Sequence, residues 1–297
     1  MTSTPHPRPS RQSNHRRLSR QLGHRLRRAA QAPLDKLDDL GDQLSLYGRA
    51  IGWMPRALRR YRKEIARLLA EVSFGSGALI VILGTAGVMA ALSLFVGSLV
   101  GLQGFRALNA AGTEALTGLL TAYFNTRDIA PLVASIALIS TLGAGYTAEL
   151  GAMRISEEID ALEAMSVPSV PYLITTRVIA GFIAVIPMYT IGLAMSYGAS
   201  RLNVTLVSGL PGGTYDHYFS LFLPVSDVLW SYVKVLTFAF VIILVCCHYG
   251  YRASGGPAGV GIAVGRAVRA CIVIVAVMDF FLTLVIFGTF TSVRVAG

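Results

Sequence analysis

Long apolar runs separated by short polar segments dominate this chain of 297 residues. Ala78 to Leu102 contains no charged residue and Tyr232 to Cys247 contains one, and both reach or approach the roughly 20 residues that a helix needs to cross a bilayer. Further apolar stretches cover Ala107 to Tyr146, Pro171 to Ser200, 228–250 and 267–290. The pattern predicts a polytopic membrane protein built from helices.

The stretch from Ala107 to Tyr146 is interrupted near its middle by polar residues and a proline, at 125–128 and at Pro131. Hydropathy alone does not decide whether this stretch crosses the membrane once or twice. Arg252 and Arg266 in the 251–266 loop, with Arg269 shortly after it, mark this loop as cytoplasmic by the positive-inside rule, and the 201–227 connection is poor in basic residues. With a cytoplasmic amino terminus, these assignments require an even number of crossings before 147–169. We therefore expect 107–146 to be one broken crossing, which gives about five transmembrane helices.

An amphipathic pattern precedes the first span, from Leu44 to Val72. Apolar residues recur there at helical spacing, and basic residues fill much of the remaining surface. The apolar positions are Leu58, Tyr61, Ile65, Leu68 and Val72. Such a helix suits the surface of an anionic cytoplasmic leaflet, with its apolar stripe in the acyl boundary. An ordinary amphipathic helix that packs on protein is the alternative.

The net charge of +10 comes from the beginning of the chain, because residues 1–70 hold 16 of the 26 Lys and Arg but only 5 of the 16 Asp and Glu. The remaining residues are almost neutral, so we expect no nucleic-acid partner. Residues 1–42 are rich in Arg, Ser and Pro and cannot bury enough apolar surface to order themselves. The predicted organisation is a basic, mostly disordered cytoplasmic extension at 1–42, an interfacial helix at 43–73 and a transmembrane domain at 74–297.

An acidic, amphiphilic segment at 147–169 interrupts the membrane pattern. Ile155, Ile159, Leu162 and Met165 are spaced to share one helical face, and Ser156 is placed to cap the helix. The charged side chains on the other faces are Glu157, Glu158, Asp160 and Glu163. We expect a short helix with few intramolecular partners, which suits docking into a groove of a cytoplasmic protein.

Three motifs resemble the MlaE/YrbE permease family: Arg127-Asp-Ile-Ala-Pro131, Thr147-Ala-Glu-Leu-Gly-Ala-Met-Arg154 and Glu158-Ile-Asp-Ala-Leu-Glu-Ala-Met165. Lys234 and Met278-Asp279-Phe280 match in order, and the resemblance covers roughly 45–290. It implies an all-α integral membrane permease of an ABC-type lipid transporter, in which the acidic segment is the cytoplasmic coupling helix. The residues that it places at the ATPase contact are Glu149, Met153, Arg154, Glu157, Glu158, Asp160, Leu162, Glu163 and Met165.

The same resemblance implies the partners. These are a second permease of the same kind, identical or not, a cytoplasmic ATPase that carries ATP and Mg²⁺, and extracytoplasmic Mce-domain proteins. The cargo would be a phospholipid, fatty acid or sterol. Arginine outnumbers lysine 23 to 3, a usage common in GC-rich genomes such as those of actinobacteria, in whose Mce systems YrbE permeases occur in pairs.

We interpret four ionisable residues as charges inside the membrane: Arg127, Asp128, Lys234 and Asp279. A charge at the bilayer centre costs about 2.5–3.5 kcal/mol on insertion scales. These side chains should therefore pair with one another, as Lys234 with Asp279, or border a water-filled lipid route. Both interpretations stay open.

The sequence also excludes common catalytic sites. None of the three lysines follows a glycine, so there is no Walker A motif, and His-Glu-x-x-His and Gly-x-Ser-x-Gly are absent. Cys246, Cys247 and Cys271 lie in apolar runs as expected packing residues, with no predicted metal site or cofactor. Gly143, Gly145 and Gly151 should allow close approach of helices. The alternative functions are an ion-coupled secondary transporter or channel and, last, a membrane-embedded lipid-modifying enzyme.

Overall fold

The computed structural model describes residues 41, 43–74 and 84–288, and these form helices without a strand. The chain divides into two compact units, Met1–Gly48 and Arg49–Gly297. In the first, the described residues 43–48 are helical, and Gln43 bonds to Tyr47 one turn later. The predicted extension at 1–42 lies almost entirely outside the described residues. The spans and the candidate sites belong to the second unit.

Five helical runs among the described residues are long and apolar enough to cross a membrane. The first is α3 (Thr85–Ala110). The second joins six elements in one run: η1 (Glu114–Leu116), α4 (Thr117–Phe124), η2 (Asn125–Ile129), α5 (Ala130–Leu138), η3 (Ile139–Gly143) and α6 (Ala144–Ile155). The third joins η4 (Val170–Thr175), α8 (Thr176–Leu202) and η5 (Asn203–Val207), and the fourth and fifth are α10 (Val225–Tyr251) and α11 (Gly256–Phe287). The prediction of an all-α membrane protein with five spans is confirmed. The interrupted stretch is one continuous run.

Several span boundaries differ from the predicted ones, because helices continue past the apolar residues. The turn at Gly112 (φ 71°) follows α3, so the second run begins at Glu114 and not at Ala107. At the other end of the chain, Gly255 (φ 91°) precedes α11, which begins 11 residues before the predicted 267. The predicted polar connection at 201–226 is mostly helical and contains α9 (Gly212–Leu221).

Small residues bring α3 and α8 into close contact. The buried face of α3 repeats every fourth residue, and Gly97 and Gly101 lie on it. A Cβ on Gly97 would come 2.4 Å from the carbonyl oxygen of Ser196, and one on Gly101 would come 2.9 Å from that of Ser200. Backbones that approach this closely gain dispersion contacts that larger side chains would prevent. The α3–α8 pair therefore depends on glycine at these positions.

Four π-helical segments occur in the second and third spans, η2 to η5. The first begins at Asn125, which is fully buried and donates from Nδ2 to Ser200 Oγ at 2.8 Å. Ser200 Oγ in turn lies 2.7 Å from the carbonyl oxygen of Gly97. The wider turn at η2 thus places a polar side chain where it links three spans. Such turns mark places where helices commonly bend.

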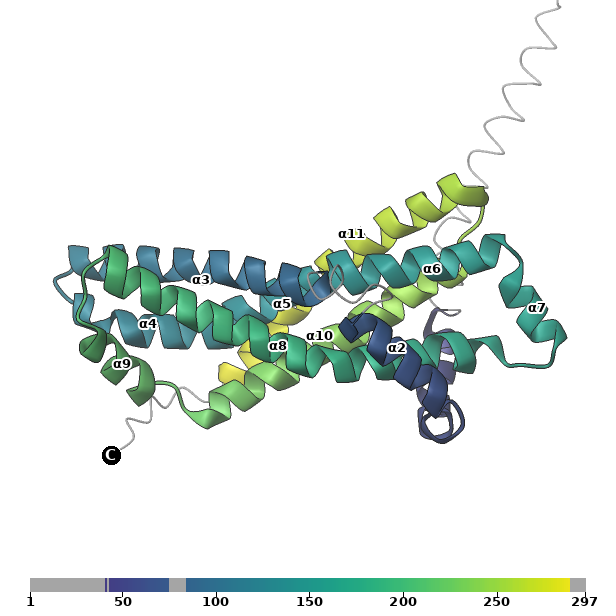
Figure 1. Ribbon diagram of the computed structural model, residues 1–297, viewed down its shortest axis with the longest axis horizontal. Coiled ribbons are helices and arrows are strands. Elements are labelled where there is room, and N and C mark those ends of the chain that lie inside the picture. Colours follow the sequence, from purple (N-terminus) through teal and green to yellow (C-terminus); the bar gives the residue numbers. More distant parts are fainter. Residues whose placement is uncertain (1–40, 42, 75–83, 289–297) are drawn as a thin grey trace, which may run out of the picture. The chain divides into compact units, whose positions relative to one another are not determined.

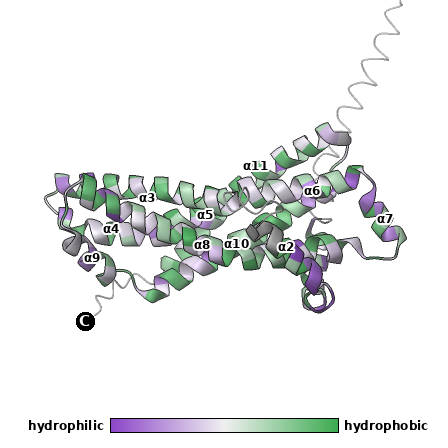
Figure 2. Ribbon diagram, viewed as in Figure 1, coloured by the Kyte–Doolittle hydropathy of each residue, from purple (hydrophilic) through white to green (hydrophobic). Residues whose placement is uncertain are grey.

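The short helices α7 (Glu158–Ala164) and α9 lie at opposite ends of the spans (Figure 1). The turn between α10 and α11 is at the α7 end, because Tyr251 Oη lies 2.9 Å from Ser169 Oγ. This agrees with the expected placement of 147–169 and 251–266 on one side. Figure 2 shows hydrophobic residues along the spans and hydrophilic residues gathered in loops and short helices.

The helix α9 is fixed to the second span through Tyr215. Its hydroxyl lies 2.8 Å from Thr121 Oγ1, and burial raises the pKa of Tyr215 to about 12. The phenol therefore stays protonated in neutral solution and keeps this hydrogen bond. On its exposed face, Asp216 pairs with Arg201 of α8 at 2.8 Å.

The amphipathic segment before the first span is two helical pieces, 49–60 and α2 (Arg62–Phe74), separated at Tyr61. Ile65 and Leu68 are buried against Ile179 and Ala180 of α8. For these two residues the alternative interpretation, packing on protein, is confirmed, and the placement of the segment at the membrane interface stays a prediction. Leu58, in contrast, is 50% exposed, and Val72 lies among positions whose side chains are not described.

The packing of α10 against α11 includes two cysteines. Cys246 Sγ and Cys271 Sγ lie 3.5 Å apart as buried free thiols. A Cβ on Gly143 would come 2.9 Å from Cys246 Sγ, and one on Gly151 would come 2.9 Å from Val260. Both glycines therefore allow the predicted close approach. Gly145 faces open space, so the prediction is wrong there.

Candidate functional site

The acidic segment forms a helix-turn-helix corner between the second and third spans. The second span ends at Ile155 and α7 begins at Glu158, with Glu157 in the left-handed conformation (φ 62°) between them. Ser156 does not cap α7 as predicted. Its hydroxyl lies 3.0 Å from both the carbonyl oxygen of Ala152 and Glu158 Oε1, because the left-handed turn directs it back onto the preceding helix.

The apolar face of α7 is narrower than predicted. Ile159 is completely buried and Leu162 is half-buried, and these two residues hold the helix against the protein. Met165 is 66% exposed, because α7 ends at Ala164 and the chain turns away. The expected common face is therefore wrong for Met165, which lies free at the exposed tip of the corner.

The acidic side chains of α7 have more intramolecular partners than predicted. Asp160 forms an ion pair with Arg154 at 2.6 Å. Glu163 accepts hydrogen bonds from Ser169 (2.6 Å) and from Tyr251 (3.2 Å), which joins α7 to the start of the third span and to the end of α10. The corner is therefore hydrogen-bonded to two spans, so that a force applied to α7 is transmitted to both.

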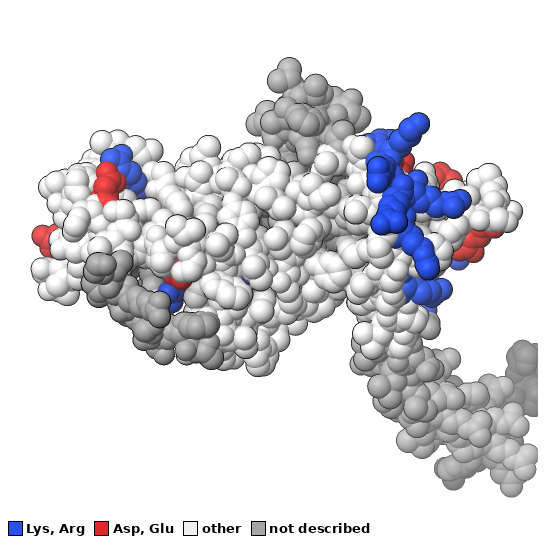
Figure 3. Space-filling model, turned by 90° about the horizontal axis from the view of Figure 1, so that it is seen from below, with Lys and Arg blue, Asp and Glu red and all other residues white. Residues whose placement is uncertain are grey.

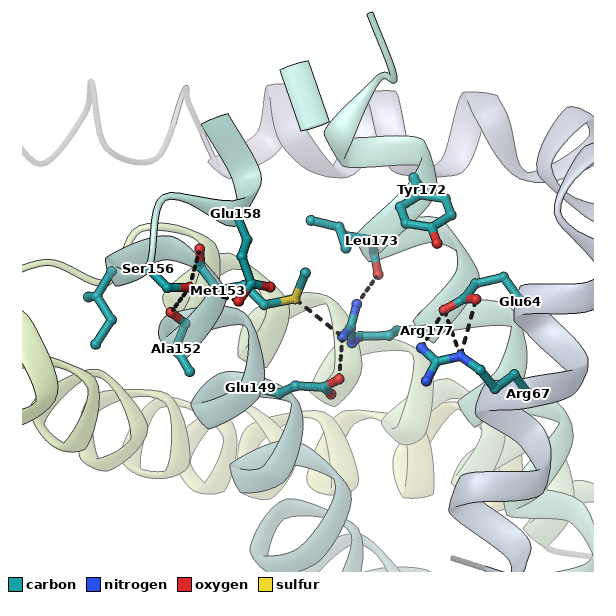
Figure 4. Close-up of a pocket in the computed structure, with 11 residues that line it drawn as sticks. Glu64, Arg67, Glu149, Ala152, Met153, Ser156, Glu158, Tyr172, Leu173 and Arg177 are labelled. Atoms are coloured by element: carbon teal, nitrogen blue, oxygen red, sulfur yellow. Dashed lines mark hydrogen bonds and ion pairs between the residues drawn. The ribbon is translucent and has the colours of Figure 1, made fainter. Parts of the chain in front are cut away.

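A cleft of about 730 Å³ lies beside this corner, between α2, α6 and the start of the third span. Figure 4 shows Arg177 between Glu149 and Leu173. Arg177 is 3% exposed, and its guanidinium lies 2.8 Å from Glu149 Oε1 and donates to the Leu173 carbonyl oxygen at 2.9 Å. Its Nη2 is also 4.0 Å from Met153 Sδ. The predicted coupling residues Glu149 and Met153 thus contact a buried arginine of the third span.

The second group of charges lies inside the spans and centres on Lys234, whose side chain is fully buried. Its Nζ lies 2.6 Å from Asp279 Oδ1, 3.2 Å from Asp128 Oδ1 and 2.7 Å from Thr283 Oγ1. It also donates to the Arg127 carbonyl oxygen at 2.9 Å. Since a buried ammonium is tolerated only when it is paired and hydrogen-bonded, these four groups explain how α10 can carry a lysine.

Arg127 belongs to a neighbouring pair. Its guanidinium lies 2.6 Å from Asp227 Oδ2 at the start of α10 and is stacked between the rings of Tyr123 (4.2 Å) and Phe287 (4.6 Å). Arginine suits this position because its flat face is weakly hydrated and its edge donates to a carboxylate. The side chain is fixed by three spans, the second, fourth and fifth.

Comparison with known proteins adds to this geometry. A sequence model described as Permease MlaE matches residues 74–285. The chain belongs to the MlaE permease family.

Similar proteins come from bacteria and a plant. The chain is 28% identical over 196 residues to "Probable ABC transporter permease protein" of Rickettsia bellii, which covers 66% of this chain and 76% of the relative. It is 28% identical over 197 residues to "Intermembrane phospholipid transport system permease protein MlaE" of Haemophilus influenzae, with 66% and 75% covered. It is 29% identical over 201 residues to "Protein TRIGALACTOSYLDIACYLGLYCEROL 1, chloroplastic" of Arabidopsis thaliana, with 66% and 56% covered.

The MlaE-family match contains both groups of candidate residues and excludes the basic helical segment at 49–73. Of the two interpretations of the buried charges, the pair of Lys234 with Asp279 is present, and a role in a lipid route stays a prediction. The nine predicted coupling residues lie together at one end of this MlaE-family permease, and their contact with an ATPase also stays a prediction.

Sequence reasoning missed several residues of these sites, among them Arg177, Asp227 and Thr283. Arg177 lies within the predicted span 171–200, and a lone arginine in an apolar run was a usable signal. Asp227 lies in the 201–227 connection, which the sequence analysis judged only by its shortage of basic residues, and Thr283 had no signal of its own. Their partners lie many residues away in the chain, so only the packing of the spans brings them together.

Proposed function

We propose that this MlaE-family chain is the permease subunit of an ABC-type lipid transporter, driven by a separate cytoplasmic ATPase that binds ATP and Mg²⁺. The amino terminus and α7 would be cytoplasmic, and the membrane would be the inner (plasma) membrane. A second permease, identical or not, and extracytoplasmic Mce-domain proteins would complete the complex. The resemblance implies a phospholipid, fatty acid or sterol as the cargo, and the name of the Haemophilus influenzae relative favours a phospholipid.

The observation that carries the proposal is the continuity of the second span. One helical run, Glu114–Ile155, bears Asp128 of the buried cluster at one level and Glu149 to Arg154 of the α7 corner at its end. Its 42 residues correspond to about 63 Å of helix, about twice the hydrocarbon thickness of roughly 30 Å. A helix of this length can transmit a movement of α7 into the spans.

The mechanism follows from these ties. Closure of the ATPase would displace α7, and the contacts of Glu163 with Ser169 and Tyr251 would move the third and fourth spans together with the second. The π segments η2 and η3 provide places where the long run can bend. Bending near η2 would change the separation of Asp128 from Lys234 and so alter the polar surface offered to a lipid headgroup.

Lipid binding itself would come mainly from burial of acyl chains, about 0.8 kcal/mol per CH₂. Leu94, Phe95 and Leu99 of α3 are exposed in the isolated chain and supply apolar surface for this purpose. The charged groups would orient the headgroup rather than supply most of the affinity.

The test is purification of the complex from its host. Glu157→Lys combined with Glu158→Lys should abolish co-purification with a Walker-motif ATPase, because both side chains are exposed at the corner. The matched control is Glu114→Lys with Asp216→Lys, which makes the same charge change at the α9 end and should leave the ATPase bound. Equal loss from both variants, or no loss from either, would contradict the proposed coupling site.

An ion-coupled transporter is the second candidate, favoured by the cluster of Lys234 with two carboxylates. Lipid uptake that continues without any ATPase and collapses with the proton gradient would support it. Turnover of lipid by the purified chain alone would instead indicate a lipid-modifying enzyme.

A further inference from the structure

A second groove, separate from the α7 corner, lies on the segment that precedes the first span. It has a volume of about 600 Å³ and is lined by residues from both sides of the break at Tyr61: Pro55, Leu58, Arg59, Arg62, Ile65, Ala66 and Leu69. Five of these seven residues are apolar, and the two polar ones are arginines. The groove lies outside the part of the chain that matches the family.

The two arginines are available for a ligand. Arg59 and Arg62 are exposed, and neither forms an ion pair with any described residue. The Nε of Arg62 donates to the Leu58 carbonyl oxygen at 3.3 Å, which positions its guanidinium over the groove. Arg67 of the same segment differs, because Glu64 neutralises it at 2.6 Å.

The charge around the groove is strongly positive. Residues 49–69 contain seven basic residues and one acidic residue: Arg49, Arg56, Arg59, Arg60, Arg62, Lys63 and Arg67 against Glu64. Figure 3 shows Lys and Arg gathered near one end of the molecule, next to a smaller group of Asp and Glu. A ligand with a negative charge is therefore favoured, and guanidinium groups bind phosphate oxygens in a bidentate manner.

The position of the groove along the third span favours a membrane lipid as its ligand. Ile65, which lines it, packs against Ile179 and Ala180 of α8. Those residues lie nine and ten positions after Val170, the start of the third span, or about 14 Å along a helix. The groove is therefore beside the end of an apolar span, where headgroups meet acyl chains. Trp53, 36% exposed and covered by Arg56 at 5.4 Å, is also typical of this boundary.

We propose that this groove binds one anionic phospholipid of the cytoplasmic leaflet, with its phosphate on Arg59 and Arg62 and an acyl chain on Leu58, Ala66 and Leu69. The lipid is bound as a resident molecule that fixes the segment at the membrane boundary. The site does not depend on the proposed transport function, since no residue of the α7 corner or of the buried charge cluster lines it.

The experiment uses the full chain in detergent and native mass spectrometry to count retained lipid. Short-chain phosphatidylglycerol should be retained, whereas phosphatidylcholine of the same chain length and inorganic phosphate should not. Arg59→Gln with Arg62→Gln should lower the affinity for phosphatidylglycerol by roughly tenfold or more, since even one hydrogen bond between charged groups contributes about tenfold. Ala66→Trp, which fills the groove, should lower it similarly without changing the charge.

The matched control is Arg60→Gln with Lys63→Gln. It removes the same charge from adjacent exposed positions that do not line the groove, and it should reduce binding by a clearly smaller factor, because it leaves the direct contacts of Arg59 and Arg62 with the phosphate in place. Equal losses from the two double variants would overturn the proposal in favour of diffuse attraction. Equal retention of phosphatidylcholine or of phosphate, or unchanged binding by Ala66→Trp, would also overturn it. Circular dichroism of each variant establishes that the helices remain.

Discussion

Lys234 of α10 and Asp279 of α11 form an ion pair at 2.6 Å in which the lysine is fully buried. Lys234→Met should lower the stability of the chain by about 3 kcal/mol or more, because Asp128 and Asp279 are then left as neighbouring charges without the cation. Thermal unfolding in detergent measures this. Adding Asp279→Leu to Lys234→Met should recover part of the loss, and strictly additive losses would show that the two residues do not interact.

Asp279→Leu alone should affect lipid transport more than assembly, because Lys234 keeps Asp128 and Thr283 as partners. Reconstituted complexes allow both quantities to be measured, the transport rate in vesicles and the yield of the assembled complex by size-exclusion chromatography. A variant that fails to assemble would mean that the pair serves only the packing of α10 on α11.

Gly97→Ala should destabilise the α3–α8 contact by about 1–3 kcal/mol, the usual cost of overpacking, because its Cβ would come 2.4 Å from the Ser196 carbonyl oxygen. Gly198→Ala is the matched control on α8, since that position faces open space. The control should be neutral or stabilising by up to about 1 kcal/mol through helix propensity. The same assay of thermal unfolding applies, and equal effects would contradict the close approach.

Acid should loosen α9 through Asp216. The hydrogen bond from Arg201 holds the pKa of the Asp216 carboxyl below its ordinary value. A lowered pKa in the folded state means that this stabilisation is complete above the ordinary pKa of about 3.9 and is lost as the pH falls further. The protection factors of α9 amides, which compare measured hydrogen exchange with the intrinsic rate at the same pH, should therefore fall below that pH in the natural chain. In Asp216→Asn they should be low already at neutral pH, and an unchanged pH profile in that variant would exclude Asp216 as the cause.

Deletion of residues 1–40 should leave lipid transport intact if this basic extension has no partner. The transport rate of the truncated chain is compared with that of the natural chain, in vesicles with and without anionic lipid. A large loss of transport in the truncated chain would show that the extension has a function of its own.

The five spans and the acidic corner could be predicted from the sequence, because both depend on local pattern. The spans follow from long runs of apolar residues, and the corner follows from a cluster of acidic residues that interrupts them. The sequence was not sufficient for the partners of charged residues. Arg127 pairs with Asp227, and Arg177 with Glu149, through contacts that depend on how whole spans pack. The π turns and α9 were missed because polar residues such as Asn203 and Asp216 can continue a helix as well as end it.

The buried thiols of Cys246 and Cys271 can serve as a cross-linking probe of the spacing between α10 and α11. Their sulfur atoms are 3.5 Å apart, whereas a disulfide requires about 2.05 Å, so a small relative movement of α10 and α11 decides whether a membrane-permeant oxidant can link them. Cross-linking yield in the resting and in the ATP-driven complex would then report the spacing of these two helices with the natural residues, without any introduced label.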